Sequence, residues 1–339
     1  LVRSAKITDW LEVGATNEAY HLYCEAAQFI IEDNPEFMER ALNIPKEIGE
    51  RIRASWDADE LSLYGRFDFI LAKDGAPKIL EFNADTPTSL LEASVIQWQW
   101  KEDVFPECDQ FNGIHEGLVQ SWKDIFPKKG EIYFAGALEN NEDTGTLQYL
   151  ASTAMEAGFS TRVLDMQALD LQNGRFFDPA GELVNRCFKL YPWEWMVDES
   201  PDGCLAEMEW LEPIWKLVMS NKAILATLYE LFPDSPYVLP CYLSRPRSGL
   251  FCKKPVFSRE GHNVSVVDIR NWEEHVRIAE TEGDYNTGAY VYQEYVEPTV
   301  YSGRYPVIGS WIIGGEAAGI GIRENRMEVT DKIGRASCR

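Results

Sequence analysis

Positive charge is scarce in this chain. Its 339 residues carry 32 Lys and Arg against 55 Asp and Glu, and the net charge at pH 7 is −23. Nucleic acid and anionic membrane surfaces repel such a chain, so we expect neither as a partner. The sequence also lacks a signal-peptide pattern and any apolar run of about eighteen residues, so we expect no membrane association. Small-molecule substrates are the partners that we expect. Nothing in the sequence determines the oligomeric state.

Histidine and paired cysteines are also rare. The four histidines form no ligand-like pair, which argues against a zinc site or a histidine-based catalytic triad. The seven cysteines include no C-x-x-C spacing and are odd in number. That pattern favours reduced thiols over a disulfide framework, so the sequence predicts a cytoplasmic protein.

Two common nucleotide-binding motifs are missing as well. The sequence has no G-x-x-x-x-G-K-[ST] loop and no G-x-G-x-x-G, which excludes Walker and Rossmann sites. The length predicts two or three lobes, and the order of predicted helices and strands predicts an α/β fold. Periodicity predicts helices over 17–56, 89–125, 144–158, 207–231 and 272–280. Short apolar runs predict strands over 131–138, 161–165, 249–257, 264–268, 289–296, 307–313 and 317–323.

The most informative stretch is a predicted hairpin over residues 64–83. Two alternating segments flank Asp74 and Gly75. This dipeptide suits the two positive-φ positions of a two-residue type I′ turn. With that turn, Lys73 pairs with Ala76, and the register of both strands follows.

This register places four polar side chains on one face of the hairpin. Asp68 faces Glu81, and Arg66 faces Asn83. The alternate residues, which fill the other face, are apolar: Phe67, Phe69, Leu80 and Phe82. Opposed carboxylates need a counter-charge, and Mg²⁺ takes carboxylate and amide oxygens beside phosphate oxygens. A solvated face with cross-strand pairs explains the same residues, and both interpretations stay open here.

Polar groups continue beyond the hairpin. Residues 84–89 are too polar to be core, and Ser89 is placed to cap the apolar run 90–96. A helix N-terminus beside four polar groups suits an anion and a metal. Further along, Glu142 and Asp143 follow the first strand of a small β-α-β unit, at the edge where open sheets bind ligands. They are candidates for holding a cationic group, and a helix-start role explains them equally well.

Cations come from the last third of the chain. Phosphate chemistry needs cations on the phosphates, oxygen ligands for Mg²⁺ and a lid against water. Lys222, Lys254 and Arg323 lie on separate predicted elements, and residues 258–263 form a glycine-containing loop at a hairpin tip. Taken singly, Lys222 also fits a solvated helix position and Lys254 the edge of a strand.

In combination these motifs resemble the synthetase domain of the glutathionylspermidine synthase family, a branch of the ATP-grasp ligases. The matching stretches lie between about 60 and 325: GRFD (65–68), LEFNADTPTSLLEA (80–93), PIWKL (213–217), SNKAIL (220–225), KKPVFSREGHN (253–263), YQEY (292–295) and YPVIGSW (305–311). The resemblance implies an ATP-grasp fold, in which nucleotide lies between two sheets, with a pre-ATP-grasp-like α/β subdomain. It implies an N-terminal helical region with the metal hairpin (1–128), a substrate subdomain (129–200) and a nucleotide-binding region (201–339).

The resemblance also implies roles for individual residues. The metal ligands fall on Asp68, Glu81 and Asn83, and the catalytic arginines on Arg66 and Arg323. The nucleotide contacts fall on Lys222, Lys254, Arg259, Gly261, Gln293, Glu294 and Tyr295. The substrate contacts fall on Thr86, Thr88, Glu142 and Asp143. The implied cofactors are ATP and Mg²⁺.

The implied reaction is an ATP-dependent ligation. A carboxylate takes the γ-phosphoryl group to give an acyl-phosphate, which an amine converts to an amide; glutathione or a related peptide and a polyamine-like amine are the implied substrates. Two departures stand out: Ser258 replaces a usual glycine of the phosphate loop, and residues 191–197 lack the threonines that hold glutathione. The alternative is an ATP-binding, catalytically inactive paralogue that acts as a nucleotide-dependent partner protein.

Overall fold

The computed structural model describes residues 14–258, 262–278 and 288–325. Arg259 and Gly261, two of the predicted nucleotide contacts, lie outside these ranges. Within them the strands form sheets of four, five, four and three strands. No described helix is long and apolar enough to cross a membrane.

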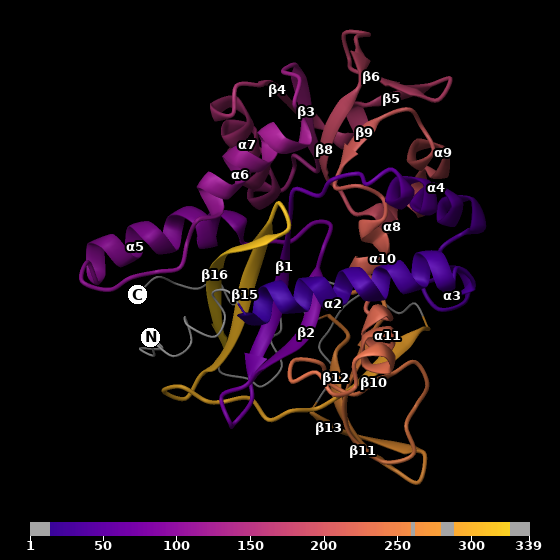
Figure 1. Ribbon diagram of the computed structural model, residues 1–339, viewed down its shortest axis with the longest axis vertical. Helices are drawn as coiled ribbons and strands as arrows, with labels where there is room; N and C mark the ends of the chain where they lie inside the picture. The colour runs from indigo at the N-terminus through magenta and orange to yellow at the C-terminus, as the bar shows by residue number, and fades with distance from the viewer. Residues whose placement is uncertain (1–13, 259–261, 279–287, 326–339) are drawn as a thin grey trace.

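The sheet that carries the predicted hairpin has the order β16-β15-β1-β2. Strands β1 (Tyr64–Leu71) and β2 (Pro77–Asn83) form the first hairpin, and β15 (Tyr305–Ile313) and β16 (Glu316–Asn325) form the second. β1 pairs antiparallel with β15, so the sheet joins segments from opposite ends of the chain (Figure 1). The predicted domain boundaries remain a prediction, with this sheet shared between the first and third regions.

Helix α2 (Thr16–Gln28) covers the apolar face of this sheet (Figure 1). The ring of Tyr23 lies 5.2 Å from that of Phe67 and 5.4 Å from that of Phe82, both edge-on. Phe67 and Phe82 are themselves stacked at 4.1 Å across the hairpin. Since α2 occupies this face, the polar residues of the hairpin project toward the opposite side.

The turn of the first hairpin differs from the prediction. Ala72, not Lys73, pairs with Ala76, so the loop has three residues and ends on Gly75 at φ +84°. A bulge then inserts one extra residue, Leu80, into β2, and Ile79 takes the buried position predicted for Leu80. The two one-residue differences cancel. Asp68 therefore faces Glu81 as predicted.

The five-stranded sheet contains most of the C-terminal strands. Its order is β10 (Cys241–Tyr242), β14 (Tyr290–Glu294), β11 (Gly249–Pro255), β12 (Ser265–Arg270) and β13 (Glu273–Ile278). The helix predicted over 272–280 is wrong, because residues 273–278 are strand β13 and pair with β12. A turn at Asn271 and Trp272, both at positive φ, returns the chain along β12.

A small parallel sheet builds the predicted β-α-β unit. Its order is β4 (Ser160–Asp165), β3 (Glu131–Gly136), β8 (Arg186–Leu190) and β9 (Glu209–Leu211). Helices α6 (Ile114–Ile125) and α7 (Asn141–Glu156) pack beside it, and Trp122 of α6 lies edge-on to Phe134 of β3. Trp122 is fully buried and donates to Thr153 Oγ1 at 2.9 Å. Short strands β5 (Asp170–Gln172), β6 (Arg175–Phe177) and β7 (Leu183–Val184) form a separate sheet.

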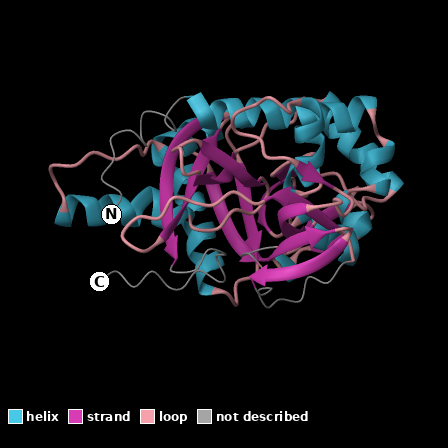
Figure 2. Cartoon of the chain, turned by 90° about the horizontal axis from the view of Figure 1, so that it is seen from below, coloured by secondary structure: helices cyan, strands magenta, loops and turns pink. Residues whose placement is uncertain are grey.

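The remaining helices are short and surround the sheets (Figure 2). They are α3 (Glu36–Arg40), α4 (Lys46–Asp57), α5 (Gln97–Val104), α8 (Trp193–Glu199), α9 (Pro201–Cys204), α10 (Lys216–Ser220) and α11 (Ile224–Leu231). The turns at Phe29–Asp33 and Glu92–Ile96 are π-helical, and Met166–Ala168 is a 3-10 turn. The single helix predicted over 207–231 is therefore strand β9 followed by two short helices.

Candidate active site

The polar face of the first hairpin forms the base of the site. Arg66 faces Asn83, and Asp68 faces Glu81, in the predicted register. Both Arg66 and Asp68 lie on β1, which is an inner strand of its sheet, and both are buried. Gly309 of β15, opposite Asp68, leaves room for the Arg66 side chain, because a Cβ there would lie 2.9 Å from Arg66 Cδ.

Two arginines bind one carboxylate at this position. Arg66 donates to Asp68 through Nε at 2.7 Å and through Nη2 at 3.1 Å, and Arg323 of β16 donates from Nη2 to Asp68 Oδ2. Arg66 Nη1 also donates to the carbonyl of Thr88, which ties the strand to the segment after the hairpin. The two predicted catalytic arginines therefore lie together, with Asp68 between them.

These contacts decide the charge of Asp68. Burial alone would raise the pKa of its carboxyl group, but the charges of Arg323 and Arg66 outweigh burial and lower the pKa to about 2. Asp68 is thus ionised at neutral pH. The pKa of Arg66 is lowered, first by burial and then by the repulsion of Arg323.

Glu81 has its own cation. Lys222, in the turn before α11, lies with Nζ 3.0 Å from Glu81 Oε2 and donates to the carbonyl of Ser258 at 2.6 Å. Burial raises the pKa of Glu81, whereas Lys222, the strongest opposing influence, and Lys254 bring it below its ordinary value. The amide of Asn83 lies 3.5 Å from Glu81 Oε1.

Lys254 joins the hairpin sheet (β16-β15-β1-β2) to the five-stranded sheet. Lys254 of β11 donates from Nζ to the carbonyl of Leu80 at 3.1 Å and to Gln293 Oε1 at 2.7 Å. Gln293 of β14 in turn donates to the carbonyl of Ile79 at 2.9 Å. The bulge in β2 thus presents two successive carbonyls to the five-stranded sheet. The site therefore lies where the two sheets meet.

The family's hinge, which reads adenine through backbone groups, is implied at Gln293, Glu294 and Tyr295, and the last two follow Gln293 directly. Glu294 ends β14 and donates its backbone N–H to the carbonyl of Pro240 at 2.7 Å, and Tyr295 donates its own to Leu250 at 3.0 Å. Glu294 lies opposite Phe251 of β11, three residues along that strand from Lys254. Their role in reading a nucleotide base stays a prediction.

The residues present fit a phosphate ligand and its metal. Four cations surround two carboxylates, and the chain has left two polar atoms here buried without a partner, Arg323 Nε and Ser258 Oγ. An oxyanion satisfies such a donor, and an ionised Asp68 beside Glu81 and Asn83 supplies the hard oxygen donors that Mg²⁺ prefers. No group of three His, Cys, Asp or Glu side chains in the described ranges could hold a metal alone. Phosphate oxygens would therefore complete its coordination.

The predicted substrate residues divide into two groups. Thr88 belongs to the site, with its Oγ1 3.4 Å from Arg66 Nη1, and Thr86 lies two residues before it in the same turn. Glu142 and Asp143 occupy the first turn of α7, where Asn140 caps the helix by accepting from the N–H of Glu142 at 2.9 Å. These acids lie on a different element from the arginine pair, and their binding role stays a prediction.

Sequence reasoning missed four buried charged residues near the open end of the hairpin. They are Asp85, Lys189, Glu212 and Lys216, all at most 1% exposed. Lys189 stands in the apolar strand Arg186–Leu190, and a lone lysine in such a run is the sequence signal for a buried ion pair. Its partner could not be identified, because Asp85 lies 104 positions away.

Comparisons with known proteins agree with this geometry. The family model "Glutathionylspermidine synthase preATP-grasp" matches residues 2–337. A putative acid–amine ligase of Haemophilus influenzae is 38% identical over 294 residues, covering 82% of this chain and 74% of that protein. Trypanothione synthetase of Crithidia fasciculata is 28% identical, over 92% of this chain and 52% of its own length. The bifunctional glutathionylspermidine synthetase/amidase of Escherichia coli is 26% identical, over 94% and 56%.

The chain therefore spans about half the length of the last two relatives. Among solved structures, a glutathione synthetase-like effector of Globodera pallida aligns with 96% of this chain and 86% of its own, at a TM-score of 0.59 and 11% identity. This likeness confirms the predicted α/β fold of ATP-grasp type. By its sequence, the chain belongs to the glutathionylspermidine synthase family of ATP-dependent, amide-forming ligases.

Proposed function

We propose that this chain joins a carboxylate to an amine, using ATP and passing through an acyl-phosphate. The observation that carries the proposal is the meeting of four cations and two carboxylates between two sheets, in a member of a ligase family. Two of these cations, Lys222 and Lys254, are buried, and a surplus of buried positive charge is costly unless an anion binds it. A polyphosphate is such an anion.

The proposed reaction has two steps, and the placement of the charges supports it. A substrate carboxylate oxygen forms a bond to the γ-phosphorus of ATP, the bond to the β-phosphate oxygen breaks, and ADP leaves. The amine nitrogen then attacks the acyl carbon, phosphate leaves and the nitrogen loses a proton. Arg66 and Arg323 stabilise the negative charge on the transferring phosphoryl group, and Lys222 and Lys254 hold the phosphates of the nucleotide. When bound at Asp68, Glu81 and Asn83, Mg²⁺ would supply charge neutralisation between the phosphates.

The substrates we propose are glutathione or a related peptide, and a polyamine-like amine. Support comes from the relatives named trypanothione synthetase and glutathionylspermidine synthetase, and from the paired acids Glu142 and Asp143 at the start of α7. Residues 191–197 differ from the family pattern, and here Tyr191 contacts Glu199 and Trp195 instead. Because this segment holds glutathione in the family, the peptide substrate should be varied most widely in an assay. The cytoplasmic location stays a prediction.

A catalytically inactive, ATP-binding paralogue is the second candidate. A chain released from catalysis has no need of the transition-state arginines. Arg66 and Arg323 nevertheless both contact Asp68, and Gly309 leaves the room that Arg66 needs. This arrangement favours an active ligase.

The experiment is ADP release from Mg²⁺-ATP, measured with a panel of acid and amine pairs. The panel combines glutathione, γ-glutamylcysteine and short γ-glutamyl peptides with spermidine, putrescine and amino acids. We expect at least one pair to stimulate ADP release together with formation of an amide product of the summed mass less one water. The variant Arg66→Met should lose this stimulation at least a hundredfold. ATP binding without stimulation by any pair would contradict the ligase proposal and favour the inactive paralogue.

A further inference from the structure

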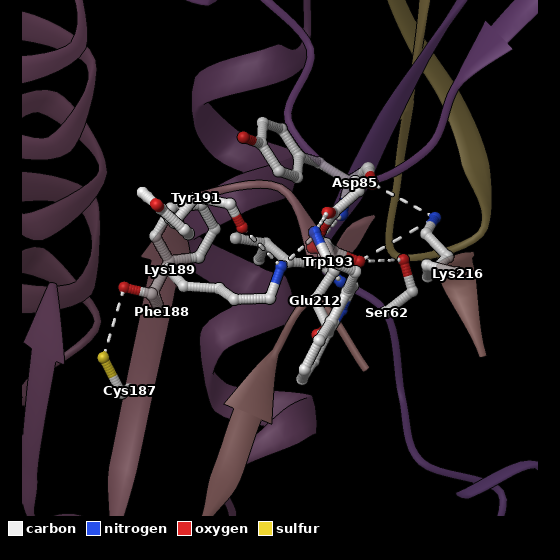
Figure 3. A network of polar contacts seen from close by, with 11 residues as sticks. Ser62, Asp85, Cys187, Phe188, Lys189, Tyr191, Trp193, Glu212 and Lys216 are labelled. Atoms are coloured by element: carbon white, nitrogen blue, oxygen red, sulfur yellow. Dashed lines mark hydrogen bonds and ion pairs between the residues drawn. The ribbon is translucent and has the colours of Figure 1, made fainter. Parts of the chain in front are cut away.

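The open end of the metal hairpin is held in a closed network of buried charges (Figure 3). At the start of β1, Glu212 Oε1 accepts from the backbone N–H groups of Leu63 and Tyr64, both at 3.1 Å. Its second oxygen accepts from Ser62 Oγ at 2.6 Å and lies 3.8 Å from Lys216 Nζ. Lys216 Nζ also donates to the carbonyl of Tyr64 at 3.2 Å. Two side chains of one segment thus fix the entry of β1.

The exit of β2 is fixed in the same way from another segment. Asp85 Oδ1 accepts from Lys189 Nζ at 2.7 Å, and its Oδ2 accepts from the backbone N–H of Trp193 at 2.8 Å. Lys189 Nζ donates also to the carbonyl of Tyr191 at 2.9 Å and lies 4.2 Å from the centroid of the Trp193 ring. Lys189 is 0% exposed and Asp85 1%.

One side chain connects the two halves. The indole N–H of Trp193 donates to the carbonyl of Glu212 at 3.1 Å (Figure 3). Lys189 is the last residue but one of β8 in the small parallel sheet, and Trp193 begins α8. A displacement of β8 and α8 would therefore move the end of β2 through Asp85. It would also move the start of β1, through Trp193 and Glu212.

The positions of the attachment points matter for the site. Asp85 stands two residues after Asn83 and immediately before Thr86, and Tyr64 stands two residues before Arg66. The segment that Asp85 anchors ends in Thr88, whose carbonyl accepts from Arg66. The network thus fixes, at short range, the metal face of the hairpin and the turn that borders it.

We propose that Lys189 and Asp85 are positioning residues that couple the small α/β unit to the metal face of the hairpin. The inference rests on the nucleotide and metal part of the proposed function. Stability does not require an ion pair at this place, because a buried pair replaced by apolar residues of similar volume often leaves a protein equally stable. What an apolar pair cannot supply is the fixed direction of two charge-assisted hydrogen bonds on Asp85.

Removing both charges together separates an effect on the stability of the chain from an effect on the position of the hairpin's metal face. The variants are Lys189→Met, Asp85→Leu and the double variant, and the probe is a non-hydrolysable ATP analogue titrated calorimetrically with Mg²⁺ and again with EDTA. We expect each single variant to unfold at a lower temperature, and the double variant to unfold within a few degrees of the wild type. In the double variant the affinity with EDTA should be unchanged, whereas the tightening caused by Mg²⁺ should fall at least tenfold.

A matched control lies in the same α/β unit. Asp178 is a buried carboxylate that accepts from Arg162 at 3.0 Å and from Tyr133 at 3.2 Å, and these contacts join it to β3 and β4 rather than to the hairpin. Asp178→Asn should lower the unfolding temperature and leave the Mg²⁺-dependent tightening at its wild-type value.

A double variant with wild-type Mg²⁺ dependence would overturn the inference. If the double variant does not fold, Trp193→Phe provides the second test, because it removes only the indole donor between the two halves. We then expect the Mg²⁺-dependent tightening to fall about threefold, and an unchanged value would overturn the inference. A wild-type chain that binds the analogue with Mg²⁺ but turns over no substrate pair contradicts the ligase proposal and leaves this inference standing.

Discussion

Two clusters of buried charge lie on the same hairpin and differ in their balance. The cluster on its polar face has the cations Arg66, Arg323, Lys222 and Lys254 and only two carboxylates, Asp68 and Glu81. The cluster at its open end has two lysines and two carboxylates: Lys189, Lys216, Asp85 and Glu212. The first also leaves Arg323 Nε without a partner, whereas no charged atom of the second is left so. An unbalanced cluster can take an anionic ligand, and a balanced one has no need of one.

The carboxyl pKa values follow the same division. Asp68, Asp85 and Glu212 are buried and Glu81 is half-buried, and loss of solvent raises the pKa of each of these carboxyl groups. On the polar face the surplus cations reverse this effect and lower the pKa of Asp68 to about 2. At the open end a single lysine per carboxylate does not reverse it, so the pKa of Asp85 is raised and that of Glu212 reaches about 7. Cation number, more than burial, thus distinguishes the proposed ligand site from the balanced cluster at the open end.

Breaking the balanced cluster should give the largest effect. Lys216→Met removes the lysine that pairs with the buried Glu212, and removing one partner of a buried pair costs about 3–5 kcal/mol. We expect the free energy of unfolding, measured with guanidinium chloride at pH 8, to fall by this amount. The loss should be smaller at pH 5, where Glu212 is protonated. Equal losses at both pH values would contradict the role given to this pair.

Neutralising one carboxylate of the unbalanced cluster should act on catalysis instead. Glu81→Gln removes a predicted metal ligand and leaves Lys222 unpaired, so we expect kcat to fall about 10²–10³-fold, or about 3–4 kcal/mol of transition-state stabilisation. The matched control is Glu297→Gln. Glu297 pairs with Lys73 at the far end of the same hairpin, on the surface, and its kcat should match the wild type. A Glu81→Gln enzyme with full turnover would refute the metal assignment.

The pH dependence of stability tests the raised pKa of Glu212. The folded chain retains a proton on Glu212 up to about pH 7, whereas the unfolded chain releases it near the ordinary pKa of 4.5. Stability therefore falls as pH rises between these values, by up to about 3 kcal/mol. The variant Glu212→Gln lacks this titration, so its stability relative to the wild type should rise from pH 5 to pH 8 in denaturant unfolding. A constant difference would show that Glu212 titrates normally, despite its burial.

The smallest effect concerns the room left for Arg66. In Gly309→Ala the new Cβ would lie 2.9 Å from Arg66 Cδ, so the guanidinium has to move away from Asp68. We expect kcat to fall about tenfold, or about 1.4 kcal/mol, with little loss of unfolding temperature. Gly49→Ala is the control, because its Cβ meets only Met38 at 3.5 Å, inside helix α4. It should keep full activity and gain about 0.5–1 kcal/mol of stability.

The hairpin part of the candidate site could be predicted from sequence because its contacts are local and follow strand alternation. Asp68 and Glu81 face each other through a short hairpin, although the predicted two-residue turn is wrong and the bulge at Leu80 compensates for it. The strands that carry Lys254, Gln293 and Arg323 were also predicted, since each is a short apolar run.

What the sequence does not contain is long-range pairing. The helix predicted over 272–280 is strand β13, because pairing with β12 outweighs the helical pattern of the local sequence. β13 is an edge strand, and its Val276 is exposed. The balanced cluster was missed for the same reason. Asp85 and Lys189 are 104 positions apart, and Glu212 and Tyr64 are 148 apart. Only the folded chain shows that they meet at one end of the hairpin.

The most direct measurement of the central claim is the binding of a non-hydrolysable ATP analogue to the wild-type chain, with Mg²⁺ and with EDTA. If the unbalanced cluster is a nucleotide and metal site, one analogue binds per chain, at least tenfold more tightly with Mg²⁺. The double variant Lys222→Met and Lys254→Met should abolish this binding and remain folded. Binding that is equally strong with and without Mg²⁺, or that survives the loss of both lysines, would contradict the account.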